Sequence, residues 1–506
     1  MSEALPGMVV PPLAPPAQPR PSAVGVLYRR VASGVEVFWV KREKALRFAG
    51  GFYAFPGGKV DKADAQVQVR GASGQQAAVL VAAARELFEE TGVLVAQGAE
   101  RLSPERLKQM RQALLANERG WAELLSESGL TLRSEDFLPA GRWITPPFMP
   151  VRFDTWFFLV EAPPHAVAEL WPGELTEAEW VAPAAALSRW EEGTALLHAP
   201  GLYVLQVLAR FDTLESVQAR LEAPPNCPEH VATVVEFQQG VRIVPLVTPT
   251  LPPATHTNGY VLGNGELLLV DPGAEDEREL DKLQELLSIL AQEGMRPVAL
   301  VLTHHHWDHV GGARRVKERL GIPLWCHART ADRLEVPVER LLEEGEVLEL
   351  AGNPPQRWRV LHTPGHARGH ICLVDERSRA AVVGDMVAGV GTIVIDPPEG
   401  NMRDYLTQLA RLRDFPVTTL YPAHGGALPD GPGKLQEYLQ HRAAREARIL
   451  EALPPSGATL AQVVERAYSD TPPFLHPVAE RSALATLEKL VAEGRVRAEA
   501  ALYVPC

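Results

Sequence analysis

The stretch ALVLTHHHWDH, residues 299–309, decides the fold predicted for the second half of the chain. An apolar run with strand character, ALVL, ends just before a cluster of three histidines, and an aspartate and a fourth histidine follow. A strand that ends in a turn can direct His304 and His306 toward one metal ion. Asp308 and His309 then turn toward a second ion. The stretch therefore predicts one loop that serves two metal ions.

Three further potential ligands follow in short motifs after predicted strands: His366 in HTPGHARGH, Asp385 in VVGDM and His424 in YPAHGG. Three histidines with a bridging carboxylate at one ion, and an aspartate with two histidines and the same bridge at the other, leave room for a shared hydroxide. The ordered set predicts a binuclear zinc hydrolase site in which Asp308 is catalytic. Its ligands are His304, His306, Asp308, His309, His366, Asp385 and His424.

Over about residues 233–430 the sequence resembles the metallo-beta-lactamase superfamily. Besides the histidine motifs, HTNGYVLG (256–263) and LLLVDPG (267–273) look like the first strands of that family, with Asp271 in its usual supporting position. The resemblance implies an αββα sandwich with two Zn²⁺ at one edge of the packed sheets. It also implies hydrolysis by a bridging hydroxide.

The reaction stays open, because superfamily members cleave lactams, thioesters and phosphodiesters. Only 39 positions separate Asp385 from His424, which leaves no room for the domain that some RNA-processing members insert there. Residues 441–506 show three helical segments and a hairpin, and they resemble the winged-helix end of the beta-lactamase-like protein 2 group, which includes a single-strand endoribonuclease. The tail carries equal numbers of basic and acidic residues, which favours a lid or packing role over a grip on nucleic acid.

The resemblance to the beta-lactamase-like protein 2 group implies a phosphodiester substrate similar to single-stranded RNA. The alternative is thioester hydrolysis of the glyoxalase II type. A third possibility is a single-iron oxygenase on the same scaffold, as in persulfide dioxygenases.

A second cluster of potential metal ligands lies nearer the N-terminus, in FPGGKVDKAD (55–64) and AAARELFEETGVLV (82–95). On a helix, Glu86, Glu89 and Glu90 share one face, since they are three and four positions apart. Such a cluster repels itself unless a cation is bound, and carboxylates are suitable ligands for Mg²⁺ or Mn²⁺. The two stretches resemble the box of the Nudix hydrolases, whose second half, REUxEExGU with U aliphatic, is matched at every fixed position.

The Nudix resemblance implies an α/β/α sandwich, a Mg²⁺ or Mn²⁺ site made by Glu86, Glu89 and Glu90, and hydrolysis of a nucleoside diphosphate derivative. Arg85 belongs to the predicted catalytic set, where it orients the glutamates. The segment WITPPFMPVRFDTWFFLV (143–160) also looks like the Nudix motif 19 group of coenzyme A diphosphatases, so coenzyme A is one candidate substrate.

The chain departs from the Nudix pattern in two ways. About 13 extra residues interrupt the box between Gly58 and Arg85, as in the motif 19 group, and the first glutamate of the box would fall on Ala77. The missing glutamate motivates an alternative, in which the first domain is an inactive module that senses a nucleotide and regulates the hydrolase behind it.

Size and composition set the wider frame. At 506 residues the chain exceeds a single core, and 46% hydrophobic with 22% charged residues is typical of a soluble protein without a membrane span. Four dispersed cysteines and the lack of a signal peptide favour the cytoplasm, while a net charge of −13 disfavours binding of nucleic acid by charge alone. The predicted parts are a disordered tail (1–21), a Nudix-like domain (22–220), a proline-rich linker (221–232), a metallo-beta-lactamase domain (233–435) and a winged helix (441–506).

Overall fold

The computed structural model describes residues 16–46, 49–149, 151–164, 166–171, 173–210 and 213–506. They form two compact units, one that extends to Gln239 and one that spans Gly240–Cys506. Residues 1–15 of the predicted tail lie outside the described part, and strand β1 already begins at Arg20. None of the described helices is long and apolar enough to cross a membrane.

Alternating apolar residues give the first unit a sheet with two buried faces. On β1 (Arg20–Val31), Leu27 packs on one side with helix α1 (Gly74–Thr91), while Val26 and Tyr28 pack on the other with α5 (Ala199–Leu208). Side chains of a strand alternate between faces, so helices cover both sides. The strand order is β3-β2-β1-β8-β7, with β4 beside β1 and β9 beside β2. The bounds are β2 Gly34–Arg42, β3 Tyr53–Ala54, β4 Gly57–Lys59, β7 Leu138–Ile144, β8 Phe153–Glu161 and β9 Leu175–Val181. The predicted α/β/α sandwich is confirmed.

The remaining helices of the first unit include two, α2 (Pro104–Leu115) and α3 (Trp121–Glu127), where the sequence shows one helical run near 102–125. After α4 (Pro183–Glu191) and α6 (Leu214–Glu222), the short strand β10 (Val235–Gln238) ends the unit. Phe237 packs edge-on against Phe52, with ring centroids 5.2 Å apart, which ties this segment to the first core.

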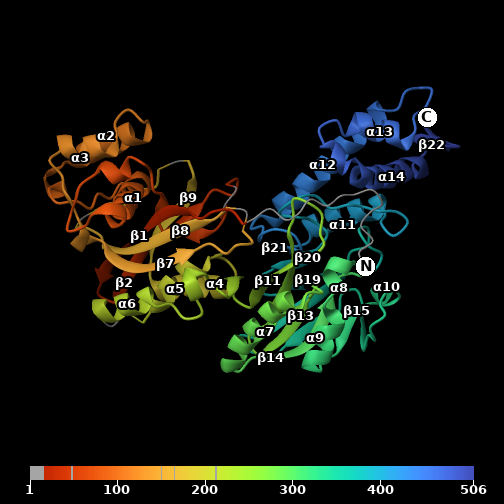
Figure 1. Ribbon diagram of the computed structural model, residues 1–506, viewed down its shortest axis with the longest axis horizontal. Helices are drawn as coiled ribbons and strands as arrows, with labels where there is room; N and C mark the ends of the chain where they lie inside the picture. The colour runs from red at the N-terminus through yellow and green to blue at the C-terminus, as the bar shows by residue number, and fades with distance from the viewer. Residues whose placement is uncertain (1–15, 47–48, 150, 165, 172, 211–212) are drawn as a thin grey trace. The chain divides into compact units, whose positions relative to one another are not determined.

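The second unit contains two sheets with helices on their outer faces. The first runs in the order β11-β12-β13-β14-β15-β16 and the second in the order β17-β18-β19-β20-β21. Figure 1 shows α7 and α9 beside β13 and β14, and α11 near β20 and β21. The predicted αββα sandwich is confirmed. The first sheet comprises β11 Val241–Val247, β12 His256–Leu262, β13 Glu266–Val270, β14 Arg296–Leu302, β15 Leu324–His327 and β16 Arg340–Leu342. The second comprises β17 Val347–Leu350, β18 Gln356–His362, β19 Ile371–Asp375, β20 Ala381–Gly384 and β21 Leu420–Pro422. The helices are α7 Glu277–Gln292, α8 Trp307–Val310, α9 Ala313–Leu320, α10 Ala328–Ala331 and α11 Met402–Asp414.

The chain ends in the predicted winged helix. Helices α12 (Gly431–Glu451), α13 (Leu460–Ala467) and α14 (His476–Ala492) precede the hairpin of β22 (Val496–Glu499) and β23 (Leu502–Pro505). Their shared core is fully buried and contains Ile449, Val463, Ala483, Leu487 and Leu490.

Candidate metal centres

Strand ends position all the predicted ligands of the second unit. The loop after β14 carries His304 and His306, and α8, which follows directly, carries Asp308 and His309. The other three ligands come from the loop after β18, the end of β20 and the end of β21. They are His366, Asp385 and His424. Because these strand ends meet at one edge of the packed sheets, residues 120 positions apart reach one site.

The first group of ligand atoms comprises His304, His306, His366 and Asp385, whose nitrogen and oxygen atoms all lie within 4.8 Å of one another. Nδ1 of His306 lies 3.0 Å from Nε2 of His304 and 2.8 Å from Nε2 of His366. Oδ2 of Asp385 lies 3.3 Å from Nε2 of His366. Ligands of a tetrahedral zinc ion are about 3.3 Å apart, so the group has the size that such an ion requires.

The second group comprises Asp308, His309 and His424. Oδ2 of Asp308 lies 3.8 Å from Nε2 of His309 and 3.6 Å from Nε2 of His424. The other oxygen of Asp385, Oδ1, faces this group at 3.7 Å from His309 and 3.4 Å from His424. Asp385 therefore presents one oxygen to each group, as a carboxylate that bridges two ions must.

Two buried atoms at the centre of this arrangement test whether it fits metal ions. Within the described part of the chain, Nε2 of His309 and Oδ1 of Asp385 have no hydrogen-bond partner. An unpaired buried polar atom is costly, and buried groups of this kind are normally satisfied. A cation between the two atoms satisfies both, so the residues present fit a divalent metal pair.

Burial also sets the charge of the ligands. Desolvation lowers the pKa of His304 and His366 well below the usual range, and the neighbouring histidines add to this, so both rings are neutral as metal ligands must be. Desolvation also lowers the pKa of His309, but the carboxylates around it, first that of Asp308, outweigh burial and raise the pKa to about 10. The second group thus attracts positive charge, which a bound cation supplies in place of a proton.

Hydrogen bonds on the far side of the histidines fix their orientation. Nδ1 of His309 donates to Oδ2 of Asp271 at 2.8 Å, and Nδ1 of His366 donates to the Val394 carbonyl at 2.8 Å. Nδ1 of His424 lies 3.1 Å from the His256 carbonyl. Each bond holds the ring in the tautomer that leaves Nε2 available as a ligand.

Two residues outside the predicted ligand set hold Asp385 and Asp308 in place. Nε2 of His370, in the same HTPGHARGH motif as His366, accepts the backbone N–H of Asp385 at 3.1 Å. Oγ1 of Thr257 donates to Oδ2 of Asp308 at 2.9 Å. Both residues lie in stretches that the sequence singles out, His370 in HTPGHARGH and Thr257 in HTNGYVLG. No spacing, however, shows that a threonine 51 positions before Asp308 would contact its carboxylate.

The winged helix contacts the loop that supports His366. Oγ of Ser482 on α14 accepts the N–H of Ile395 at 3.1 Å, and the guanidinium of Arg442 on α12 donates to the Ile393 carbonyl. These two contacts flank Val394, whose carbonyl holds His366. The tail therefore packs against the loop whose carbonyl orients His366.

Asp271 is the supporting residue with the most contacts. One oxygen accepts the N–H of Thr303 at 2.8 Å, and the other accepts the Thr303 hydroxyl at 2.6 Å and His309 Nδ1 at 2.8 Å. We expect Asp271→Asn to weaken zinc binding about 10- to 100-fold, because an amide nitrogen cannot accept these bonds. Competition with a chromogenic chelator measures the affinity.

Asp281→Asn is the matched control for this variant, because Asp281 lies on α7 with 68% of its side chain exposed. Far-UV circular dichroism of the metal-free proteins checks that both variants fold. Zinc affinity equal to that of the native chain in the Asp271 variant would show that the support is dispensable.

In the first unit, α1 presents the predicted glutamates, with Arg85 among them. Nη1 of Arg85 donates to Glu86 at 2.9 Å and to Glu89 at 3.1 Å. Glu90 instead accepts the N–H of Gly57 at 3.1 Å. Among the described residues, the three carboxylates are spread more widely than the ligand atoms of the two histidine groups. Arg85 binds Glu86 and Glu89, whereas the loop at Gly57 binds Glu90. Their chemistry, three carboxylates on one helix face, still suits a hard divalent cation.

Burial raises the pKa of all three glutamates. Desolvation raises the pKa of Glu86 to about 7 and that of Glu90 to about 8, with Glu86 adding to the second shift. A divalent cation bound by these carboxylates would favour their ionised form. Gly58 lies against Glu86, since a Cβ atom there would be 2.4 Å from the carboxyl group of Glu86. A larger residue at position 58 would require this carboxyl group to move.

The inserted segment of the box contributes a carboxylate of its own. Ala77 is buried in the core of the first unit, and its methyl side chain has no atom that can bind a metal ion. Asp64, in the short helix Asp64–Gln66 within the insertion, accepts bonds from Nε of Arg85 at 3.0 Å and from Nη2 at 3.1 Å. Asp64 is 1% exposed, and this two-point contact fixes the guanidinium. Sequence reasoning missed it because the insertion obscures its spacing.

Comparisons with known families match three parts of the chain. The family model described as "Metallo-beta-lactamase superfamily" matches residues 252–424, and the one described as "Beta-lactamase associated winged helix domain" matches residues 459–501. The model described as "NUDIX domain" matches residues 19–114. All three domains that the sequence predicts are thereby found.

Similar proteins cover each half separately. The chain is 31% identical to the beta-lactamase-like protein 2 homolog of Caenorhabditis elegans, over 47% of this chain and 80% of that protein. It is 30% identical to an atrochrysone carboxyl ACP thioesterase of Aspergillus chevalieri, over 43% of this chain and 69% of that protein. The crystal structure of a Nudix hydrolase from Alicyclobacillus acidocaldarius is 30% identical, covers 41% of this chain and 99% of its own, and has a TM-score of 0.36.

Proposed function

Because the chain belongs to the metallo-beta-lactamase superfamily and carries a Nudix domain ahead of that fold, it is a hydrolase, and we propose that it holds two separate hydrolytic sites. The second unit is a binuclear zinc hydrolase that cleaves a phosphodiester similar to that of single-stranded RNA. The first unit is a Mg²⁺- or Mn²⁺-dependent diphosphatase that acts on a nucleoside diphosphate derivative such as coenzyme A. The zinc assignment of the second unit rests on Asp385, whose carboxylate turns one oxygen toward each ligand group.

At the zinc site the residues of the chain divide the work. His304, His306 and His366 would hold one ion, and Asp308, His309 and His424 the other, with Asp385 between them. Two bound zinc ions lower the pKa of a shared water and stabilise charge that develops on the attacked group. Thr257 fixes the Asp308 carboxylate, and Asp271, Val394 and His256 fix the imidazole rings. The ligands are thus set in place before substrate binds.

At the Nudix site Glu86, Glu89 and Glu90 would hold the cation that neutralises a diphosphate. Arg85 orients Glu86 and Glu89 and is itself held by Asp64, so it contributes to catalysis by positioning. The bound cation supplies charge neutralisation on the diphosphate and activation of a water.

Thioester hydrolysis is the second candidate for the zinc site. It is favoured by the relative whose name describes an acyl carrier protein thioesterase, which this chain matches over most of that protein's length. The second candidate for the Nudix unit is a binding module without turnover, which the loss of the box glutamate at Ala77 favours. Nucleotide binding without Mg²⁺-dependent turnover would support that module.

A substrate panel tests both assignments. The zinc-loaded chain is assayed on single-stranded RNA, a glutathione thioester and coenzyme A, before and after zinc is removed with a chelator. We expect RNA cleavage that disappears without zinc and returns when zinc is restored, and coenzyme A cleavage that follows Mg²⁺ instead. Thioester cleavage with intact RNA would move the zinc site to acyl hydrolysis.

Metal analysis of the same preparation separates hydrolase from oxygenase. The two ligand groups predict about two zinc ions per chain. One iron ion per chain would instead support the single-iron oxygenase.

A further inference from the structure

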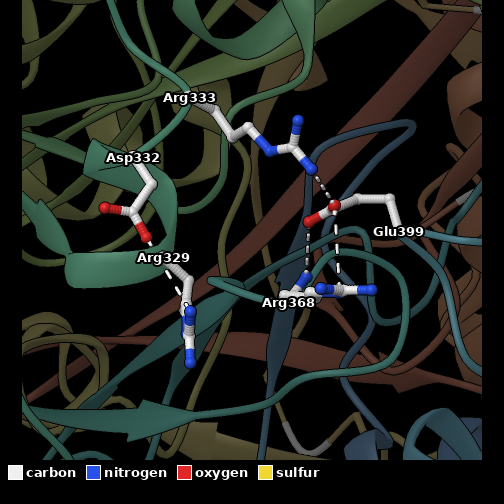
Figure 2. Close-up of a pocket in the computed structure, with 5 residues that line it drawn as sticks. All are labelled: Arg329, Asp332, Arg333, Arg368 and Glu399. Carbon is white, nitrogen blue, oxygen red and sulfur yellow. Dashed lines mark hydrogen bonds and ion pairs between the residues drawn. The ribbon is translucent and has the colours of Figure 1, made fainter.

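A pocket lined by five charged side chains lies in the second unit, apart from the metal ligands. It has a volume of about 250 Å³, and its lining residues are Arg329, Asp332, Arg333, Arg368 and Glu399. Figure 2 shows Arg333 and Arg368 converging on Glu399 from opposite directions, with Arg329 and Asp332 across the pocket. Three guanidinium groups against two carboxylates give it a net positive charge. We refer to this site as the arginine pocket.

Glu399 organises the arginine pocket. Its carboxylate is 18% exposed, accepts Nη2 of Arg333 at 2.8 Å and accepts the backbone N–H of Arg368 at 3.3 Å. Burial raises the pKa of Glu399, but the backbone N–H of Arg368 and the guanidinium of Arg333 outweigh burial, so the pKa lies below its usual value. Nη2 of Arg368 donates to the Pro398 carbonyl at 2.9 Å. One ionised carboxylate thus holds two arginines in place.

The arginines keep donors available for a ligand. The side chains of Arg329, Arg333 and Arg368 are 66%, 55% and 58% exposed, although the last two are anchored. A guanidinium has five N–H donors, and within the described residues Arg333 and Arg368 each donate one side-chain hydrogen bond. Planar, anchored guanidiniums are suited to the paired oxygens of phosphate groups.

The arginine pocket adjoins the zinc site through three connections. Arg368 lies two residues after the ligand His366, in the same loop. Glu399 and Arg333 both act electrostatically on His305, which lies between the ligands His304 and His306. Arg368 is also followed by Gly369, whose carbonyl accepts the hydroxyl of Thr330 on α10 at 2.9 Å. The arginine pocket is therefore connected to the loops that carry His304, His306 and His366.

We propose that the arginine pocket binds a second phosphate group of the substrate, separate from the bond cleaved at the zinc site. The proposal rests on the proposed function and specifies its substrate class: a molecule with a phosphate or diphosphate on one side of the scissile bond. Such a group is available from the next internucleotide phosphate of an RNA strand or from the diphosphate of a coenzyme A thioester. Net positive charge, anchored arginines and proximity to the ligand loops all support it.

The first test is binding of inorganic pyrophosphate to the metal-free full-length chain by titration calorimetry. We expect Arg333→Gln/Arg368→Gln to raise the dissociation constant about 100-fold, or about tenfold per arginine. The control is Arg319→Gln/Arg357→Gln, two arginines whose side chains are 38% and 53% exposed and pair with surface carboxylates. Pyrophosphate affinity unchanged in the pocket variant overturns the proposal.

The second test is kinetic and separates the two sources of phosphate. On the zinc-loaded chain, we expect the pocket variant to raise KM about tenfold or more with little change in kcat, either for a single-stranded RNA oligonucleotide or for acetyl-coenzyme A. Turnover of bis(p-nitrophenyl) phosphate, which has no second phosphate, stays at the native level. Equal losses on all substrates overturn the proposal. Absence of any zinc-dependent turnover in the native chain removes the proposed function but leaves the pyrophosphate result valid.

Discussion

Replacing Asp308 with alanine is expected to lower kcat/KM at the zinc site about 1,000-fold, a loss of about 4 kcal/mol of transition-state stabilisation. Oδ2 of Asp308 lies between His309 and His424 and is oriented by Thr257. Without it, the second group keeps only two histidines and the shared Asp385. Zinc content should then fall from about two toward about one per chain, which atomic absorption measures.

Asp281→Ala is the control for Asp308→Ala, since its side chain is 68% exposed on α7. The Mg²⁺-dependent activity that we propose for the first unit would provide a second reference within the same molecule, because that site uses separate residues. Full hydrolytic rate in the Asp308 variant would contradict the assignment of the second unit.

The grouping of these histidines and aspartates could be predicted from sequence because they lie in short motifs at or soon after strand ends. His304 and Asp385 illustrate this: both follow buried strands, and the fold brings those strand ends to one edge. The supporting groups could not be predicted in the same way. The Val394 carbonyl holds His366, and its position depends on contacts from Arg442 and Ser482 in a different domain. No short sequence motif predicts that residues of another domain will fix the position of a backbone carbonyl.

In the Nudix unit, the inserted segment limits what the spacing of the box can predict. Spacing marks Ala77 as the position where the glutamate of the box is absent, and Ala77 lies in the core. It does not reveal that Asp64 from the insertion contacts Arg85, because an inserted segment has no fixed register with the helix that follows. The arginine pocket has no shared motif either, because its residues come from α10 and the turn after it, from the loop after β18 and from the loop before α11.

Glu90→Gln is expected to lower the Mg²⁺-dependent diphosphatase activity of the first unit about 1,000-fold. Glutamine has nearly the shape of glutamate and retains an oxygen that can accept the N–H of Gly57, now 3.1 Å from the carboxylate. The fold should persist, while one ligand charge disappears from a site where three carboxylates face one cation. Release of phosphate-containing product from coenzyme A, followed by chromatography at saturating Mg²⁺, measures the rate.

Glu127→Gln on α3 is the matched control, because its side chain is 44% exposed and pairs only with Arg119 among the described residues. Zinc-dependent cleavage by the second unit should be unchanged in both variants. Loss of activity in Glu90→Gln would show that Glu90 acts in a working metal site. In that case the Asp64–Arg85 contact would provide the support for the helix face that the missing glutamate of the box does not. If native chain and variant bind nucleotide equally and neither turns it over, the first unit is a sensor, and its altered box serves binding alone.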